Sequence, residues 1–122
     1  MNASTTEVQI DLTYLDMMAD GDDFMKKTML DMLLEEMPPE LEKLRGAYLA
    51  QDGEELRQVA HKMKSTLAFV GNIAMTDANA ALEVIGKENT ELQRAAPHLT
   101  TLETLAPGVL NALRAESAEI AI

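Results

Sequence analysis

Apolar residues recur every three to four positions through most of the chain, which is the spacing of amphipathic helices rather than of strands. The clearest stripe lies in residues 54–70, where one narrow face of a predicted helix carries Leu56, Val59, Met63, Leu67 and Val70. A second stripe comprises Leu30, Leu33, Met37, Leu41, Leu44 and Tyr48. A third comprises Leu99, Leu102, Ala106, Val109 and Leu113. The pattern predicts a chain built from helices that each bury one face.

Capping residues indicate where the first two helices begin. A short first helix is expected over residues 11–19, with Asp11 as its N-cap and Gly21 as its stop signal. Asp22 then caps the long second helix, because an aspartate side chain satisfies free backbone N–H groups at a helix start.

Glycines indicate where the next two helices end. The turn at residues 51–53 brings the chain back antiparallel. Gly71 then ends the helix over residues 54–70, because glycine adopts the left-handed conformation of a C-cap without strain. A fourth helix is predicted over residues 75–85, with Gly86 as its stop.

Prolines interrupt two of the apolar stripes without shifting their phase. The second stripe continues through Pro38 and Pro39, and the last continues through Pro107. A proline removes a backbone donor and crowds the preceding turn, so an unbroken stripe predicts a kinked helix rather than two helices. The last helix is expected to begin between residues 90 and 100.

Short loops between amphipathic helices predict an all-α fold, an antiparallel up-down-up-down four-helix bundle with a short extra N-terminal helix. The bundle is expected to span residues 10–118, with a flexible N-terminus over residues 1–9 and a C-terminal tail over residues 119–122. A length of 122 residues fits one domain.

Composition excludes several classes of protein. The absence of cysteine excludes disulfides and thiolate metal sites. No apolar stretch reaches the roughly 20 residues of a membrane span, and the N-terminus lacks a signal-peptide core, so a cytoplasmic protein without membrane association is expected. A net charge of −11 argues against nucleic-acid binding.

The negative charge is unevenly distributed. No acidic residue falls between Leu56 and Thr76, where Arg57, Lys62 and Lys64 stand. We therefore expect a locally basic surface on an acidic protein, which suits a partner with an acidic binding pocket.

His61 lies within this stretch between Arg57 and Lys62, roughly 160° around the predicted helix from its buried stripe. Ser65 follows one turn later on the same outer face, while Lys64 and Arg57 flank the ring at helical spacing. An exposed imidazole with a cation beside it and a small residue on the next turn is accessible to another macromolecule.

These residues also carry a resemblance to a known family. His61 is followed by Lys64 at +3, Ser65 at +4, Thr66 at +5 and Gly71 at +10. This run resembles the signature of histidine-containing phosphotransfer (HPt) domains, in which position +4 is usually glycine. Ser65 departs from that pattern, but serine is small enough to leave the ring open. The resemblance covers roughly residues 10 to 118, and it extends to the helix layout, the 51–53 turn and the proline inside the second helix.

The resemblance implies that His61 carries a phosphoryl group between aspartates of receiver domains in two-component signalling. It implies that Lys64 stabilises the phosphoryl group and that Ser65 leaves steric access. The surrounding partner-binding surface would comprise Arg57, Gln58, Lys62, Ala68, Phe69 and Asn72. A solvent-exposed histidine is largely neutral at cellular pH, so no base need stand beside it.

By the same resemblance the partners are receiver domains of a hybrid sensor histidine kinase and of a response regulator. No intrinsic cofactor is expected, and Mg²⁺ would come from the partner receiver domain. We expect a monomer. The chain lacks an ATP-binding motif, so it is expected to be a carrier rather than an ATP-dependent kinase.

Other interpretations of the histidines and acids have less support. Only His98 could join His61 at a metal, and no H-x-x-x-H spacing exists. A carboxylate di-iron bundle needs Glu with His at i, i+3, whereas His61 has Lys64 at +3 and Gln58 at −3. His98 is interpreted as an ordinary surface residue. The alternative function is a non-catalytic helical adaptor that binds a receiver or another partner through the same face.

Several apolar residues lie beside the buried stripes rather than within them. Met25, Met29 and Met32 flank the stripe of the second helix, and Phe69 lies partly outside that of the His61 helix. They form either a pliable apolar docking surface or a surface that the first helix covers. The sequence leaves both alternatives open.

Overall fold

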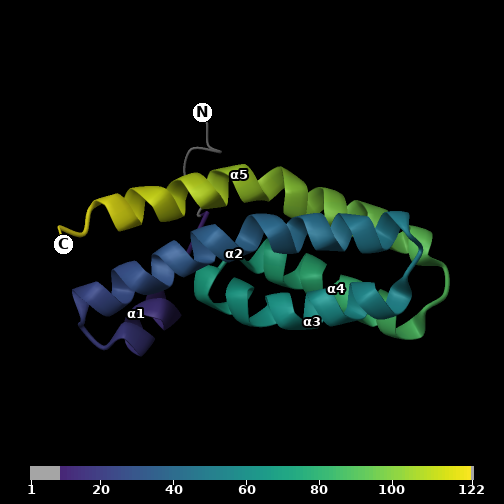
Figure 1. Ribbon diagram of the computed structural model, residues 1–122, viewed down its shortest axis with the longest axis horizontal. Helices are drawn as coiled ribbons and strands as arrows, with labels where there is room; N and C mark the ends of the chain where they lie inside the picture. Colours follow the sequence, from purple (N-terminus) through teal and green to yellow (C-terminus); the bar gives the residue numbers. More distant parts are fainter. Residues whose placement is uncertain (1–8, 122) are drawn as a thin grey trace.

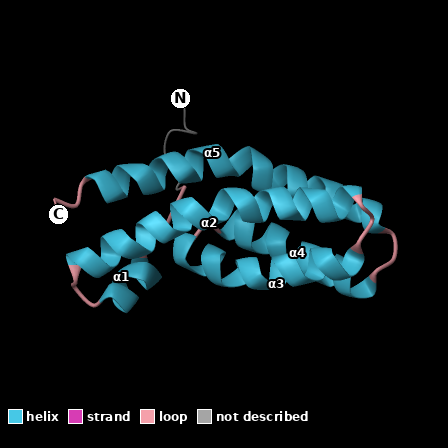
Figure 2. Ribbon diagram, in the orientation of Figure 1, coloured by secondary structure: helices cyan, strands magenta, loops and turns pink. Residues whose placement is uncertain are grey.

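The computed structural model describes residues 9–121, and every regular element among them is a helix (Figure 2). In chain order these are α1 (Thr13–Ala19), α2 (Asp23–Leu49), α3 (Gly53–Val70), α4 (Ile73–Glu88), the 3₁₀ helix η2 (Leu92–Ala95) and α5 (Ala96–Ala118). The predicted all-α fold is confirmed. Residues 1–8 of the predicted flexible N-terminus, and residue 122 of the predicted tail, lie outside the described residues.

The four long helices lie alongside one another and alternate in direction along the chain (Figure 1). Helix α2 packs against α3 and α5, and α4 packs against the same two helices, so the four contacts close a ring. The short helix α1 lies at one end, where it contacts α2 and α3.

Polar side chains cap the N-termini of three of the long helices. Asp22, Asp52 and Asn72 occupy the N-cap positions of α2, α3 and α4, and each accepts a hydrogen bond of 3.0 Å from the backbone N–H three residues later. The cap predicted at Asp22 is therefore confirmed. Gly71 ends α3 in the left-handed conformation at φ 74°, as predicted.

Helix α1 begins two residues later than predicted. Its N-cap position is Leu12, which provides no side-chain cap. Asp11 acts one step earlier, because its Oδ1 accepts from the N–H and the hydroxyl of Thr13 at 3.0 and 2.7 Å. The helix ends at Asp20 in the left-handed conformation, and Gly21 follows at φ 80°.

The stop signal predicted at Gly86 is wrong, because α4 runs on to Glu88 and ends with Asn89 at φ 55°. Gly86 serves helix packing instead. A Cβ at this position would lie 2.6 Å from the Gly53 carbonyl oxygen and 2.7 Å from the Arg57 nitrogen. The missing side chain therefore allows α3 and α4 to approach each other closely at this level.

Both proline-containing stripes form continuous helices. Helix α2 includes Pro38 and Pro39, and α5 includes Pro107. Helix α5 begins at Ala96, within the predicted window. The stripes on α3 and α5 are buried, whereas Leu41 and Tyr48 of the α2 stripe are half-buried. The apolar periodicity thus identified most of the core.

One carboxyl group lies inside this packing. Glu40 on α2 is 5% exposed, and its Oε1 accepts a hydrogen bond of 3.2 Å from the Thr66 hydroxyl on α3. Burial raises the pKa of Glu40 and outweighs the lowering by Thr66. No helix in the described part of the chain is both long enough and apolar enough to cross a membrane.

Candidate functional site

His61 lies on the outer face of α3, where the apolar periodicity placed it. Its side chain is 64% exposed, whereas Ala60 and Met63 on either side of it are fully buried. Because α3 buries one continuous stripe against its neighbours, the imidazole opposite that stripe faces solvent.

A carboxylate from the next helix approaches the imidazole. Glu83 on α4 places its Oε2 2.8 Å from His61 Nδ1 and its Oε1 3.2 Å from Lys64 Nζ. Its own side chain is 21% exposed. The hydrogen bond from His61, and then that from Lys64, lowers the pKa of Glu83 below its ordinary value. Glu83 is therefore an ionised acceptor shared by the two residues.

The contact with Glu83 distinguishes the two ring nitrogens. A carboxylate can only accept, so the neutral imidazole that fits this geometry carries its proton on Nδ1. The lone pair then resides on Nε2, the nitrogen not used in the contact. This geometry therefore leaves Nε2 as the ring nitrogen with an unshared lone pair.

Sequence reasoning missed Glu83 and expected a locally basic surface. The acid-free stretch is real, but Glu83 lies outside it and reaches the same surface from α4. A short connection between two antiparallel helices brings residues equidistant from the turn together, and His61 and Glu83 are equidistant from Asn72. That symmetry could have identified the carboxylate.

Arg57 and Gln58 are engaged elsewhere on α3. Arg57 pairs with Glu54, with its Nη2 2.7 Å from Oε2, and Gln58 donates to the same oxygen at 2.9 Å. These hydrogen bonds, led by that from Arg57, lower the pKa of Glu54 to about 2. The Arg57 side chain is thus directed to the first turn of the helix rather than toward His61. Lys62 is exposed.

Beyond His61, α3 presents small and apolar residues. Ser65 and Ala68 are exposed, and Phe69 is half-buried with its ring stacked on Tyr14 of α1 at a centroid distance of 5.0 Å. Ser65 and Phe69 line a hollow of about 180 Å³ together with Met29 and Met32 of α2.

The structure resolves the two alternatives for the flanking methionines. Met32 is 50% exposed and Met25 is 45% exposed, so α1 does not cover them. Met29 is partly buried and packs against the core. An exposed methionine surface therefore lies next to Ser65 on one side of α3.

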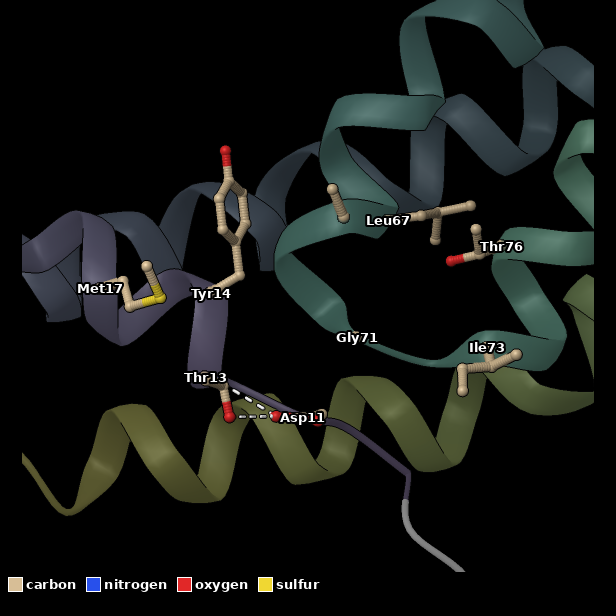
Figure 3. Close-up of a pocket in the computed structure, with 9 residues that line it drawn as sticks. Asp11, Thr13, Tyr14, Met17, Leu67, Gly71, Ile73 and Thr76 are labelled. Atoms are coloured by element: carbon tan, nitrogen blue, oxygen red, sulfur yellow. Dashed lines mark hydrogen bonds between the residues drawn. The ribbon is translucent and has the colours of Figure 1, made fainter.

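A second hollow lies on the other side of the stacked rings. It has a volume of about 360 Å³, and its lining includes Tyr14 and Met17 of α1, Ala68 of α3 and Ile73 of α4 (Figure 3). Met17 and Ile73 are strongly exposed. The outer face of α3 thus continues into an apolar surface that α1 and the start of α4 extend.

Asn72 does not belong to this surface, contrary to the prediction. It is 8% exposed and its amide is used within the chain: Oδ1 caps α4, and Nδ2 donates to the Gln9 carbonyl at 2.9 Å. Because both of its polar groups form hydrogen bonds within the chain at a helix start, the Asn72 side chain stabilises the fold rather than contacting a partner. His98 is half-buried in the first turn of α5. Among residues 9–121 there is no group of three or more side chains that could hold a metal ion.

The fold and the site together define a helical domain that exposes one histidine beside a carboxylate and a lysine. Residues 28–118 match the Hpt domain family, so more than half of the chain, including this site, is covered. The chain belongs to the Hpt domain family, whose members are phosphotransfer carriers in phosphorelays rather than kinases.

Comparison with solved structures gives a matching fold. The chain resembles the crystal structure of histidine-containing phosphotransfer protein B (HptB) from Pseudomonas aeruginosa PAO1, with a TM-score of 0.83 and 22% sequence identity. The match covers 95% of this chain and 100% of that one. At this identity the comparison supports the fold alone. No curated protein sequence matches the chain.

Proposed function

We propose that His61 accepts a phosphoryl group from a receiver aspartate and passes it to the aspartate of another receiver. The scaffold for this reaction is an antiparallel up-down-up-down four-helix bundle with a short extra N-terminal helix. The observation that carries the proposal is the geometry of His61: a 64% exposed ring whose Nδ1 lies 2.8 Å from Glu83.

The transfer step uses Nε2 as the nucleophile. Nε2 attacks the phosphorus of the aspartyl phosphate in line, the N–P bond forms, and the P–O bond to the aspartate breaks to leave a carboxylate. The ring keeps its Nδ1 proton and becomes positively charged. Glu83 stabilises that charge through the hydrogen bond to Nδ1, as the buried aspartate does for the histidine of a serine protease triad.

Lys64 is the nearest cation for the transferred phosphoryl group. It lies one turn from His61, its side chain is 58% exposed, and its Nζ lies 3.2 Å from Glu83 Oε1. Phosphoryl oxygens on Nε2 would compete with Glu83 for this ammonium because they carry more negative charge. Lys64 therefore exchanges partners as the phosphoryl group arrives.

The receiver docks on the outer face of α3. Ser65 leaves space beside the ring, Arg57, Gln58 and Lys62 contribute polar contacts on one side, and Ala68 and Phe69 lead to the two hollows. Apolar residues of a receiver fit these hollows, since exposed methionines adapt to different partners. The receivers belong to a hybrid sensor histidine kinase and a response regulator, and they supply the Mg²⁺ for the reaction. The domain acts as a monomer.

Incubation with a phosphorylated receiver tests the proposal. The protein should acquire an acid-labile, alkali-stable phosphoryl group, and His61→Gln should abolish it with little change in helicity or melting temperature, because an exposed residue contributes little packing. His98→Gln removes the other histidine and serves as the matched control, which should be phosphorylated like the parent.

Two outcomes would contradict this assignment. Retained phosphorylation of His61→Gln would show that another residue accepts the phosphoryl group. A parent protein that binds the receiver without acquiring phosphate would instead be a helical adaptor that uses the same face.

Lys64→Ala should lower the transfer rate or shorten the lifetime of the phosphohistidine without unfolding the protein. The substitution removes the nearest cation and no core contact. Both quantities can be measured in the same assay. Wild-type values for both would leave Lys64 with no function in transfer.

A further inference from the structure

Asn79 is a buried polar residue in the packing between α3 and α4. It is 1% exposed, and its Nδ2 donates a hydrogen bond of 2.8 Å to the Ala60 carbonyl on α3. Its Oδ1 is buried and has no hydrogen-bond partner among the described residues. Leaving a buried amide oxygen unpaired is costly, so Asn79 is not a residue that stability alone would favour.

The acceptor of this hydrogen bond is directly linked to the site. The Ala60 carbonyl belongs to the peptide group that joins Ala60 to His61. In an α-helix the same carbonyl accepts from the N–H four residues later, which is that of Lys64. Asn79 therefore bonds to the backbone group shared by His61 and Lys64.

The same helix also holds the side chains of these two residues. Glu83 follows Asn79 by four positions, so both lie on the face of α4 that is turned toward α3. Asn79 bonds to the backbone below His61, while Glu83 contacts the His61 ring and the Lys64 ammonium above it. Besides its apolar packing, helix α4 thus makes one buried polar contact, through Asn79, and one more exposed polar contact, through Glu83, with the His61 segment of α3.

The other close contacts between α3 and α4 lie on either side of the His61 segment. The turn at Gly71 and Asn72 joins the two helices at one end, and the close contact of Gly53 with Gly86 lies toward the other. His61 lies between these two contacts, and at its level Asn79 provides a buried hydrogen bond between the helices. A directed hydrogen bond fixes the position along and around the helix axis.

We propose that Asn79 is a positioning residue for phosphotransfer. It fixes α3 against α4 so that the Glu83 carboxylate meets His61 Nδ1 and Lys64 Nζ together. This inference rests on the proposed function of His61. Asn79 acts through Glu83 and does not touch the reacting atoms.

Two apolar substitutions test this role because they disturb packing in opposite ways. Asn79→Ala leaves a small cavity, and Asn79→Leu adds volume, but both remove the hydrogen bond to Ala60. Ser117→Ala is the matched control: Ser117 is also buried, at 5% exposure, and hydrogen-bonded, but it ties α5 to α2 rather than α4 to α3.

The first measurement is the tautomer of His61, from the ¹⁵N chemical shifts of its two ring nitrogens at a pH where the ring is neutral. In the parent the Nδ1–H form should predominate. In both Asn79 variants the population of the Nε2–H form, which is favoured in free histidine, should rise because Glu83 is no longer held against Nδ1. Ser117→Ala should match the parent.

The second measurement is the rate of phosphoryl transfer from a phosphorylated receiver, beside the urea midpoint of each variant. Transfer should slow by about tenfold in both Asn79 variants, because this reaction depends mainly on positioning. The urea midpoints of Asn79→Ala and the parent should be similar, since the lost hydrogen bond is offset by removal of an unpaired oxygen and by better helix propensity.

A parent-like tautomer population in both Asn79 variants overturns the inference, and so does a parent-like transfer rate in both. The tautomer measurement needs no phosphotransfer. A shift in tautomer would therefore establish the positioning of Glu83 even if His61 proved not to be the acceptor, and the failure of one proposal is distinguishable from the failure of the other.

Discussion

The α3–α4 pair and the α2–α5 pair form opposite sides of the same ring of helices, but different contacts hold them together. Helices α3 and α4 approach through their backbones at Gly53 and Gly86, and a buried Asn79 bonds to a backbone carbonyl. Helices α2 and α5 are joined by hydrogen bonds between side chains.

Two sets of hydrogen-bonded side chains connect α2 and α5. Toward the C-terminal end of α5, the Ser117 hydroxyl donates to Asp31 at 2.7 Å and accepts from Lys27 at 2.9 Å. Toward the other end, Arg45 Nε donates to Glu103 Oε2 at 2.9 Å. Flexible side chains of this kind tolerate small changes in helix position.

The difference is consistent with the position of the proposed transfer site on the α3–α4 pair. Where two helix backbones are in direct contact, the helices can move little relative to each other. Such a contact can therefore hold a carboxylate of one helix within hydrogen-bond distance of an imidazole on the other. Side-chain ties stabilise a fold without fixing such a distance. We therefore expect disruption of the α3–α4 pair to impair transfer, and disruption of the α2–α5 pair to affect stability alone.

The largest expected effect is that of Gly86→Ala. The added Cβ would lie within 3.0 Å of three α3 backbone atoms, so the helices must separate, at a cost of about 1–3 kcal/mol in the free energy of unfolding. Transfer should also slow, because Glu83 lies three residues from Gly86 on α4. Urea unfolding and the transfer assay check both.

Gly46→Ala on α2 is the matched control. No atom of another helix lies within 4 Å of the site of its Cβ, so alanine should raise the free energy of unfolding by about 0.5–1 kcal/mol through helix propensity. Equal effects at positions 46 and 86 would show that the backbone contact does not constrain the helices.

The next largest effect concerns space beside the ring. Ser65→Leu should slow transfer by about tenfold, equivalent to about 1.4 kcal/mol in the activation barrier. Ser65→Gly should transfer at least as fast as the parent although glycine is the poorer helix former, by up to about 1 kcal/mol. Stability and transfer should thus change in opposite directions. Equal rates for the two variants would place the docking face elsewhere on α3.

On the α2–α5 side, Ser117→Ala should lower the free energy of unfolding by about 1 kcal/mol through the lost hydrogen bonds. Its transfer rate should equal that of the parent, because no group at the site depends on Ser117. Denaturant midpoints and transfer kinetics on the same sample suffice. A slowed transfer would mean that the two sides of the ring are coupled.

The smallest effects on stability come from two carboxylates with lowered pKa values. Hydrogen bonds lower the pKa of Glu83, chiefly from His61, and that of Glu103, chiefly from Arg45. For each, the folded-state pKa lies below the unfolded value, so the stabilisation is present above about pH 4.5 and is lost as pH falls through the folded-state pKa.

Glu83→Gln and Glu103→Gln should therefore each lose at most about 1 kcal/mol at pH 7, since solvent screens both interactions. The difference from the parent should vanish in acid for both variants. Only Glu83→Gln should slow phosphotransfer. Urea midpoints from pH 3 to pH 7 give the first comparison, and the transfer assay gives the second. Equal phosphotransfer rates for the two variants would show that Glu83 has no role in the transfer step.

Much of the fold follows from local pattern. The apolar periodicity identified the buried stripes of α3 and α5, and Asp22 and Gly71 marked helix limits, because caps and one-sided burial depend on residues within a few positions of each other. The same periodicity placed His61 on an outer face. With the spacing to Lys64, Ser65 and Gly71, this was enough to indicate the Hpt family, which the match over residues 28–118 confirms.

Tertiary structure alone decided which residues surround His61. Glycine is both a helix stop and a helix contact, so the role of Gly86 depends on whether another backbone approaches it. The inward orientation of Asn72, the burial of Glu40 and the approach of Glu83 also depend on how far apart two helices lie and how each is rotated. Hydrophobic periodicity defines which face of a helix is buried, but not which residue of the neighbouring helix lies opposite a given side chain. That pairing is set by contacts between segments distant in sequence, here by Gly53 with Gly86 and Asn79 with Ala60.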